Sequence, residues 1–336
     1  MAEDKPFWET KNTAFATATA ADDFLHPEFR QQITDPSLTE TQYFGFNIPE
    51  ENIHGLCYMW HHPNLGVVTG GAWAWQGTKR YNLQCELYDF VTFMSDECLS
   101  NDLHDYTLDN SYRAQVLEPL KRYRIRYSDP KQNNSFDIHY QAVTAPMLLS
   151  SGLHLEQPLR AKGQLRLLGN DYEVDCYTVR DRSWGAPRPE VHQDFPAMAW
   201  MTGVFNDDFA FGCTAFDSPD SDPEWAGILE IPGGETVKGG WVYTEGEMVP
   251  IVNALKKTVR DPNSLYVQTL EMELVDAMDR SFLIRGEARA SAEWHTWHNF
   301  SSVISLTRWE YDGLVTHGDH QECFWQHYVR AMNPRR

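Results

Sequence analysis

The stretch Gly163-Gln-Leu-Arg-Leu-Leu-Gly-Asn-Asp-Tyr-Glu-Val-Asp-Cys-Tyr-Thr-Val179 decides the fold class of this chain. Apolar and polar residues alternate on both sides of Gly169-Asn170, which is the pattern of two half-buried strands joined by a tight turn. The sequence therefore predicts a β-hairpin here. Similar period-2 runs occur earlier in the chain, at Tyr43–Asn47, Gly55–Trp60, Val67–Trp75, Tyr81–Phe90, Tyr123–Tyr127 and Phe136–Ala142.

The segment Gly185-Ala-Pro-Arg-Pro-Glu190 interrupts this pattern, and its two prolines favour a domain junction. Further strands are expected at Ala197–Phe205, Phe209–Phe216, Ala226–Ile231, Lys238–Tyr243, Leu265–Leu274, Ser281–Ala290 and Ser301–Arg308, with one short helix at Val249–Val259. We therefore expect an all-β protein with few short helices: an N-terminal extension (1–40) and two barrel- or sandwich-like β domains (41–188 and 189–336) packed side by side.

Composition narrows the classes of function. The 336 residues contain 28 Lys and Arg against 48 Asp and Glu, a formal net charge of −20, which disfavours binding to nucleic acid or to anionic membranes. No apolar run is long enough to span a membrane, and the first residues lack the apolar stretch of a secretory signal. Six cysteines without a CxxC pair favour reduced thiols and a cytoplasmic location. The 12 Trp, 15 Tyr and 17 Phe favour a cavity for an apolar or aromatic small molecule.

The first candidate site follows the hairpin, in Val179-Arg-Asp-Arg-Ser-Trp-Gly-Ala-Pro-Arg188. Three arginines surround the carboxylate of Asp181, and Trp184 can stack on a guanidinium group. In one interpretation, the arginines hold Asp181 ionised and orient either this carboxylate or a substrate. In the other interpretation, these residues form a structural network of ion pairs and stacked side chains that joins the two domains.

A second candidate precedes the hairpin, in Gly152-Leu-His-Leu-Glu-Gln-Pro-Leu-Arg160. Because side chains alternate along a strand, His154 and Glu156 share one face. A carboxylate beside an imidazole can form an acid–base pair by fixing the tautomer or raising the pKa of the ring. Two polar residues on a solvated face would give the same pattern, so both interpretations stay open.

Histidines cluster elsewhere, but with spacings that match no known metal motif. The clusters are His61-His62, His295-Thr-Trp-His298 and His317-Gly-Asp-His320-Gln-Glu322. We predict no metal site, and metal binding by His317, His320 and Glu322 stays an open alternative. The chain also lacks a GxSxG elbow, a P-loop and a GxGxxG motif, which disfavours serine-hydrolase and nucleotide-dependent chemistry.

The two candidate segments and the hairpin between them together resemble a known superfamily. The residues that carry the resemblance are Gly152-Leu-His154-Leu-Glu156-Gln, Arg160, Gly163 and Arg180-Asp-Arg-Ser-Trp-Gly with Arg188. This superfamily is the lipocalin-like group that includes carotenoid 1,2-hydratases, AttH-type domains and kievitone hydratase. The chain looks closest to a bacterial branch marked by Asp-Arg-Ser-Trp-Gly, and the segment from His317 to Glu322 is similar to one that closes the second domain there. The resemblance implies two lipocalin-like domains, a ligand cavity and chemistry without an organic cofactor on bulky, largely apolar molecules.

The resulting hypothesis is a cofactor-independent lyase that uses general acid–base catalysis on a bulky apolar or aromatic substrate. The expected catalytic residues are His154, Glu156 and Asp181. Substrate binding is expected from Trp73, Trp75, Arg182, Trp184, Arg188 and Trp200. The reaction is either addition or removal of water or cleavage of a C–C bond with release of a small aldehyde, and an isomerase or cyclase is also compatible. A non-catalytic carrier of an apolar ligand, a metal-dependent β-barrel enzyme and a homodimer remain open alternatives.

Overall fold

The computed structural model describes residues 11–188, 194–219, 225–294 and 300–332. They divide into two compact units. Unit 1 contains Phe15–Gln76 and Leu83–Arg188, whereas Gly77–Asn82 and the residues after Arg188 belong to unit 2, together with residues 11–14. The segment 15–40, expected to be an extension, thus folds as part of unit 1. The division into domains at residues 40 and 188 stays a prediction.

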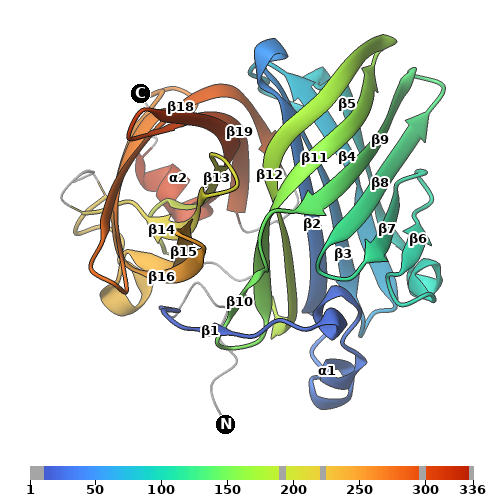
Figure 1. Ribbon diagram of the computed structural model, residues 1–336, viewed down its shortest axis with the longest axis horizontal. Helices are drawn as coiled ribbons and strands as arrows, with labels where there is room; N and C mark the ends of the chain where they lie inside the picture. Colours follow the sequence, from blue (N-terminus) through green and yellow to red (C-terminus); the bar gives the residue numbers. More distant parts are fainter. Residues whose placement is uncertain (1–10, 189–193, 220–224, 295–299, 333–336) are drawn as a thin grey trace. The chain divides into compact units, whose positions relative to one another are not determined.

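Unit 1 is built on one curled antiparallel sheet (Figure 1). The strands along its main path have the order β5-β4-β3-β2-β12-β11-β9-β8-β7-β6, and the short strands β1 and β10 extend it next to β11. Their bounds are β1 Phe15–Ala16, β2 Leu38–Ile48, β3 Ile53–His62, β4 Val67–Gln76, β5 Leu87–Ser95, β6 Asp105–Thr107, β7 Arg113–Glu118, β8 Arg122–Asp129, β9 Asn134–Ala142, β10 Met147–Leu149, β11 His154–Leu167 and β12 Asn170–Pro187. The short helical elements near this sheet are η2 Ala20–Asp23, α1 Pro27–Gln32, η3 Pro49–Glu51, η4 Asn82–Gln84 and η5 Asp96–Leu99.

The predicted hairpin is the pair β11–β12. Leu167 pairs with Asn170 across a two-residue turn, in which Leu168 (φ 48°) and Gly169 (φ 86°) both have positive φ. Such a turn matches the right-handed twist of the two strands and fixes their register from the turn outward. The register runs without interruption to His154 opposite Ser183.

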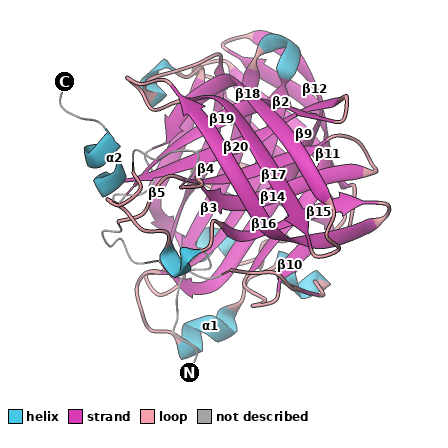
Figure 2. Ribbon diagram, turned by 90° about the vertical axis from the view of Figure 1, so that its left-hand side faces the viewer, coloured by secondary structure: helices cyan, strands magenta, loops and turns pink. Residues whose placement is uncertain are grey.

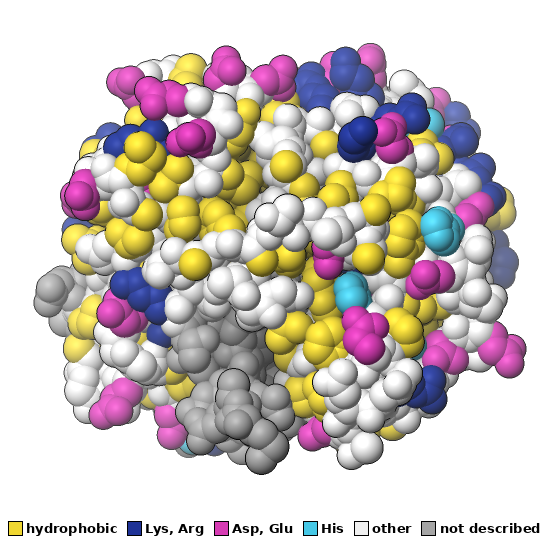
Figure 3. Space-filling model, turned by 60° about the horizontal axis from the view of Figure 1, so that its bottom comes forward, with side chains coloured by type: hydrophobic (Ala, Val, Ile, Leu, Met, Phe, Trp, Pro, Cys, Tyr) yellow, Lys and Arg dark blue, Asp and Glu magenta, His cyan; other side chains and the backbone are white. Residues whose placement is uncertain are grey.

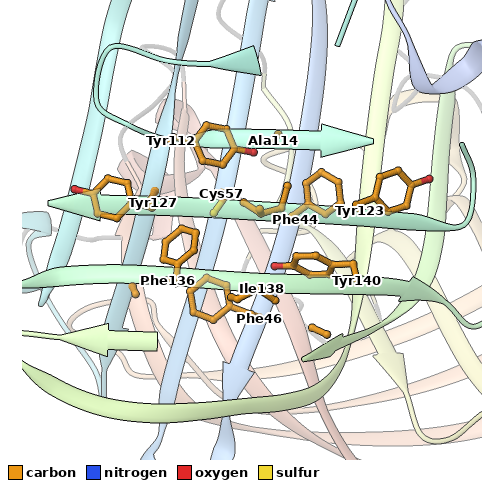
Figure 4. Close-up of a cluster of buried hydrophobic side chains, with 14 of the residues drawn as sticks. Phe44, Phe46, Cys57, Tyr112, Ala114, Tyr123, Tyr127, Phe136, Ile138 and Tyr140 are labelled. Atoms are coloured by element: carbon orange, nitrogen blue, oxygen red, sulfur yellow. The ribbon is translucent and has the colours of Figure 1, made fainter. Parts of the chain in front are cut away.

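One face of this sheet, which we call the core face, is covered by aromatic and aliphatic side chains (Figure 4). Phe44, Tyr123, Phe136 and Tyr140 are buried there with Ile138 and Cys57. Phe44 lies 5.1 Å from Tyr140 and 5.5 Å from Tyr123 between ring centroids. These rings fill the curl of the sheet, so the aromatic content of unit 1 contributes largely to packing.

Unit 2 is a closed barrel in which strands β13 to β20 follow one another in chain order. Figure 2 shows that strands make up most of the described chain and that helices are few and short. The strands are β13 Met198–Val204, β14 Phe209–Phe216, β15 Val237–Thr244, β16 Glu247–Arg260, β17 Val267–Asp276, β18 Ser281–Trp294, β19 Phe300–Tyr311 and β20 Leu314–Trp325, with η6 Pro232–Gly234 and helix α2 Gln326–Met332. Apolar side chains such as Met201, Phe211, Met272 and Trp309 form its core. Tyr328 and Met332 of α2 belong to a second cluster with Val303 and Phe324.

The prediction of an all-β chain, with lipocalin-like β units and few short helices, is confirmed in the described residues. Three local predictions were wrong. The strand expected at Tyr81–Phe90 begins only at Leu87, after the short helical element η4. Val249–Val259 is part of strand β16 instead of a helix. Ala226–Ile231 contains a turn and one isolated bridge, from Ala226 to Leu229, instead of a strand.

Charged side chains of both signs are scattered over the face of the molecule drawn in Figure 3, with apolar side chains between them. Within the described part of the chain, no helix is both long and apolar enough to cross a bilayer.

Candidate functional site

Four neighbouring strands of unit 1 place polar side chains in two rows on the face opposite the core face. In the first row, Glu156 of β11 pairs with Asp181 of β12, which pairs with Tyr43 of β2, which pairs with Tyr58 of β3. Directly paired residues point to the same side of a sheet, with their Cβ atoms about 5 Å apart. We call this side the site face.

The second row lies two residues further along the same strands, and contains His154, Ser183, Thr41 and Trp60. The two rows therefore bring two carboxyl groups, an imidazole, two phenols and two hydroxyl groups onto one side of the sheet. The hairpin register explains the proximity of His154, Glu156 and Asp181.

His154 has a hydrogen-bonding partner at each ring nitrogen. Its Nδ1 lies 2.6 Å from Ser183 Oγ, and its Nε2 lies 3.3 Å from Glu156 Oε1. His154 and Glu156 are only 5% and 6% exposed, and Ser183 is buried beside them. A hydroxyl group on one nitrogen and a carboxylate on the other fix the orientation of the imidazole. The predicted acid–base pair therefore has the geometry needed for proton transfer.

Tyr58 joins the site face to Arg188. The pKa of Tyr58 is raised to about 12, mainly because burial removes water from around the phenol. The negative charge of Asp181 adds to this rise. The positive charge of Arg188 and hydrogen bonds with Thr41 and Arg188 oppose it. The phenol is therefore neutral at pH 7. A neutral phenol beside a guanidinium group can donate a hydrogen bond to a carbonyl or phenolate oxygen.

His62 ends strand β3 near this group. Desolvation, together with smaller contributions from the positive charges of protonated His61 and of Arg188, lowers its pKa to about 4. The imidazole of His62 is thus neutral near pH 7, unlike Arg188, and can act as a hydrogen-bonding group but carries no charge.

Arg182 lies on the core face, with its neighbour in alternation, Arg180. Its guanidinium NH1 donates to the backbone oxygens of Asp22 and Phe24, at 2.8 Å each, and NH2 lies 3.3 Å from Glu40 Oε2. Arg180 binds Asp23 at 2.7 Å. Both arginine side chains are fully buried. These contacts favour a structural role for Arg182, and its predicted role as a substrate anchor stays untested.

The predicted tryptophans lie in different surroundings within their own units. Trp184 is buried beneath the sheet end, stacked on His26 with a centroid distance of 4.2 Å. Trp73 and Trp75 lie on the site face but are fully buried, 4.3 Å apart, so their indole rings act as packing in this structure. Trp200 belongs to unit 2, where it pairs with Thr214 and Gln321 and remains partly exposed. Their role in substrate binding stays a prediction.

The barrel of unit 2 holds a second charged cluster, of which only His320 and Glu322 had been considered from the sequence, as possible metal ligands. Lys256 Nζ lies 2.8 Å from Asp217 Oδ1 and 2.9 Å from Glu322 Oε1, and Arg260 binds the same two carboxylates at 2.6 and 2.7 Å. His320 Nε2 lies 3.2 Å from the other oxygen of Glu322. Two cations thus neutralise two buried carboxylates, and Arg260, Lys256 and His320 hold the pKa of Glu322 well below its usual value despite burial.

The open metal alternative finds no support in the described residues. His317 lies one position out of alternation with His320 and Glu322, and so points to the other side of β20. Among the residues that the structure describes, no three His, Cys, Asp or Glu side chains are grouped to hold a metal ion. His295 and His298 fall outside the described residues.

Tyr43, Tyr58 and Ser183 are the candidate residues that sequence reasoning missed. Ser183 had a signal, because it lies two positions from Asp181 and so keeps the alternation of the same strand. Tyr58 had no such signal, because its strand carries none of the predicted site residues. Tyr43 pairs with Asp181 across 138 positions of the chain, and no local pattern indicates such a pairing.

Comparisons with known proteins agree with this architecture. A family model described as "Domain of unknown function (DUF7064)" matches residues 19–327. The chain belongs to this family. None of the curated proteins compared with the chain matches it in sequence.

Three solved structures have a similar fold. An AttH-like protein from Nitrosomonas europaea has a TM-score of 0.62 at 12% identity, over 94% of this chain and 98% of that one. Kievitone hydratase from Nectria haematococca has a TM-score of 0.51 at 10% identity, over 96% and 99% of the two chains. CghA has a TM-score of 0.56 at 9% identity, over 96% and 95%. At the level of the fold, these matches confirm the resemblance predicted from the Asp-Arg-Ser-Trp-Gly segment.

Proposed function

We propose that this protein is a hydratase-type lyase, which adds water to, or removes it from, a bulky and largely apolar or aromatic molecule. The observation that supports the proposal is the hydrogen-bonded set Ser183–His154–Glu156, buried in the same two rows as Asp181 and Tyr58. The name of one structural neighbour, kievitone hydratase, agrees with this class of reaction.

In the elimination direction, the imidazolium form of His154 protonates the departing hydroxyl oxygen. The Asp181 carboxylate takes a proton from the adjacent carbon, the C–O bond breaks, and the electron pair of the C–H bond becomes the new C=C bond. Water leaves, and Asp181 returns its proton to His154 through solvent, so that protons balance over the cycle. Hydration is the reverse sequence, with His154 as the base that activates water.

Tyr58 and Arg188 would stabilise the charge that develops during this transfer. If the reacting carbons are conjugated to a carbonyl or phenol group, negative charge accumulates on its oxygen. A neutral phenol and a guanidinium group can donate hydrogen bonds to such an oxygen, which is the electrostatic contribution expected of an oxyanion hole. This requirement favours phenols and α,β-unsaturated carbonyl compounds among apolar substrates.

The test is incorporation of ¹⁸O from labelled water into a panel of phenolic and isoprenoid alkenes, with dehydration of the matching alcohols as the reverse assay. General acid–base groups contribute about 10²–10⁴-fold, so His154→Gln and Asp181→Asn should each lower turnover by that order while the chain stays folded. Asp175→Asn is the matched control, because Asp175 lies on the same face of β12, where it pairs with Arg160 and Lys162.

Two results would overturn the proposal. Saturable binding of panel members, followed by quenching of tryptophan fluorescence, without turnover in either direction would identify a carrier. Equal loss of turnover in Asp175→Asn and Asp181→Asn would mean that Asp181 has no specific role in the reaction.

A further inference from the structure

Unit 1 also has a groove on its surface, and this groove lies far from the two rows that contain His154 and Glu156. It is a groove of about 550 Å³ over the ends of the β8–β9 and β11–β12 hairpins and the β6–β7 connection, which lie next to one another (Figure 1). Arg166, at its rim, is ten positions along β11 from Glu156, which corresponds to about 33 Å of extended strand. Any ligand in this groove is therefore independent of the proposed reaction.

The groove concentrates arginines in a chain that is acidic overall. The groove is lined by Arg113, Arg126 and Arg166, and Arg124 lies two positions from Arg126 on β8. Three of these four guanidinium groups are neutralised by a carboxylate: Arg113 Nε lies 2.6 Å from Asp105, Arg124 Nε lies 2.8 Å from Asp137, and Arg166 binds Asp171 at 2.6 and 2.8 Å. Each pair is bidentate, which is the strong form of this contact.

Arg126 differs from the other three. Its hydrogen-bond contact is a long one, 3.3 Å from NH2 to the neutral Gln115 Oε1, and its Nε is buried with no hydrogen-bond partner. It lies between Arg113 and Asp137 in the register of β7, β8 and β9, and the carboxylates nearest to it already bind Arg113 and Arg124. Glu173, opposite Gln164 in β12, does not line the groove. One positive charge is thus left over.

This leftover charge faces a like charge. Arg113 and Arg126 are direct cross-strand partners, an unfavourable pairing of like charges. The carboxylates of Asp105 and Asp137 attract Arg126 as well, but these two negative charges are shared among three guanidinium groups, those of Arg113, Arg124 and Arg126. Hydroxyl groups surround the position, since Ser111, Ser128 and Ser135 line the same groove. Arginine with several hydroxyl donors is the donor set that recognises tetrahedral oxyanions. The net charge of −20 acts weakly here, because charges beyond about 8 Å are screened at physiological ionic strength.

We propose that the groove binds a phosphate monoester, with the phosphate group held by Arg126 and the serine hydroxyls. The volume is larger than an inorganic phosphate ion needs, and Tyr127, Phe136 and Leu165 contribute to the lining, so there is room for an organic remainder. The site is separate from the residues to which we assign catalysis.

The experiment measures binding to the full chain by calorimetry at fixed ionic strength, with phenyl phosphate, inorganic phosphate and benzoate as probes. Phenyl phosphate should bind saturably, and more tightly than the other two. Arg126→Gln should weaken this binding at least tenfold, because it removes the charge-assisted hydrogen bonds to the anion. Arg122→Gln is the matched control: Arg122 lies four positions away on the same face of β8, pairs with Glu118 and does not line the groove.

Several outcomes would overturn the inference. Equal affinity for all three anions, or equal weakening by Arg122→Gln and Arg126→Gln, would indicate unspecific attraction to positive charge. Tighter binding of inorganic phosphate than of phenyl phosphate would reject a monoester. Absence of saturable binding while both variants unfold at the temperature of the wild type would reject the site altogether.

Discussion

Replacing Arg182 with methionine separates the two roles that this arginine can have. The sequence predicts that Arg182 anchors a substrate, whereas the structure buries it completely on the core face, away from Asp181. Methionine retains most of the length of the side chain and removes the charge and the donors. It leaves the backbone oxygens of Asp22 and Phe24 without this donor and Glu40 without its guanidinium partner.

The magnitude follows from these contacts. Breaking a buried ion pair from one side costs about 3–5 kcal/mol, since the remaining charge stays buried. Each of the two carbonyl groups that loses its donor adds a smaller penalty. The cost at Glu40 is reduced in part, because this carboxylate keeps its contacts with the backbone N–H and the ring of His26. We therefore expect the free energy of unfolding of unit 1 to fall by about 4 kcal/mol. For a unit of this size, that loss lowers the melting temperature by about 8–16 °C.

The assay is urea unfolding followed by far-UV circular dichroism, together with a binding titration of the same samples below the unfolding transition. Arg160→Met is the control, because Arg160 lies on the adjacent strand and forms a partly exposed ion pair with Asp175. Its loss should cost less than about 1 kcal/mol. If Arg182→Met keeps the stability of the wild type but abolishes turnover or ligand binding, the structural interpretation is refuted and the sequence-based role is correct.

Three further predictions concern other groups. Ser183→Ala should lower turnover and displace the pH–rate profile, because it removes the hydroxyl partner of His154 Nδ1. Ser183→Thr keeps a hydroxyl group and should retain the turnover and the pH–rate profile of the wild type. An unchanged profile in the alanine variant would contradict the positioning role of Ser183. Because the pKa of His62 is depressed in the folded chain, the unfolded chain binds more protons than the folded chain between pH 6.5 and about 4. The contribution of His62 to the free energy of unfolding is therefore fully present above pH 6.5 and is lost as the pH falls through this window. His62→Asn should reduce the slope of unfolding free energy against pH in this range. Lys256→Met should destabilise the barrel by about 3–5 kcal/mol, and the exposed neighbour Lys257→Met should have little effect; similar losses would argue against a buried network.

The hairpin shows how much of the site a sequence can specify. Once the turn is placed at Leu168 and Gly169, counting outward pairs Glu156 with Asp181 and His154 with Ser183, so this part of the site follows from local information. The positions of Tyr43 and Tyr58 relative to Asp181 depend on the pairing of β2 with β12, which joins distant parts of the chain. Many pairings satisfy the same alternation of apolar and polar residues, and tertiary packing selects one of them.

The wrong helix at Val249–Val259 has a physical reason. The register of β16 shifts between Ile251 and Asn253, so the buried side chains move from odd positions (Val249, Ile251) to even ones (Ala254, Lys256). A bulge of this kind lengthens one interval in the period-2 pattern from two residues to three. When buried side chains are separated by two residues in some places and by three in others, their spacing resembles that of an amphipathic helix. For this reason the sequence pattern did not distinguish a strand from a helix here.

The segment Arg180-Asp-Arg-Ser183 divides its side chains between the two faces of the sheet, because alternation sends consecutive residues to opposite faces. Arg180 and Arg182 bind Asp23, Glu40 and backbone oxygens beneath the strand, whereas Asp181 and Ser183 point to the site face. The buried arginines thus fix the backbone from which the two site residues project. A general acid or base must be held in place to be effective, so anchoring of this strand from its core face would contribute to catalysis without any contact between the arginines and the substrate.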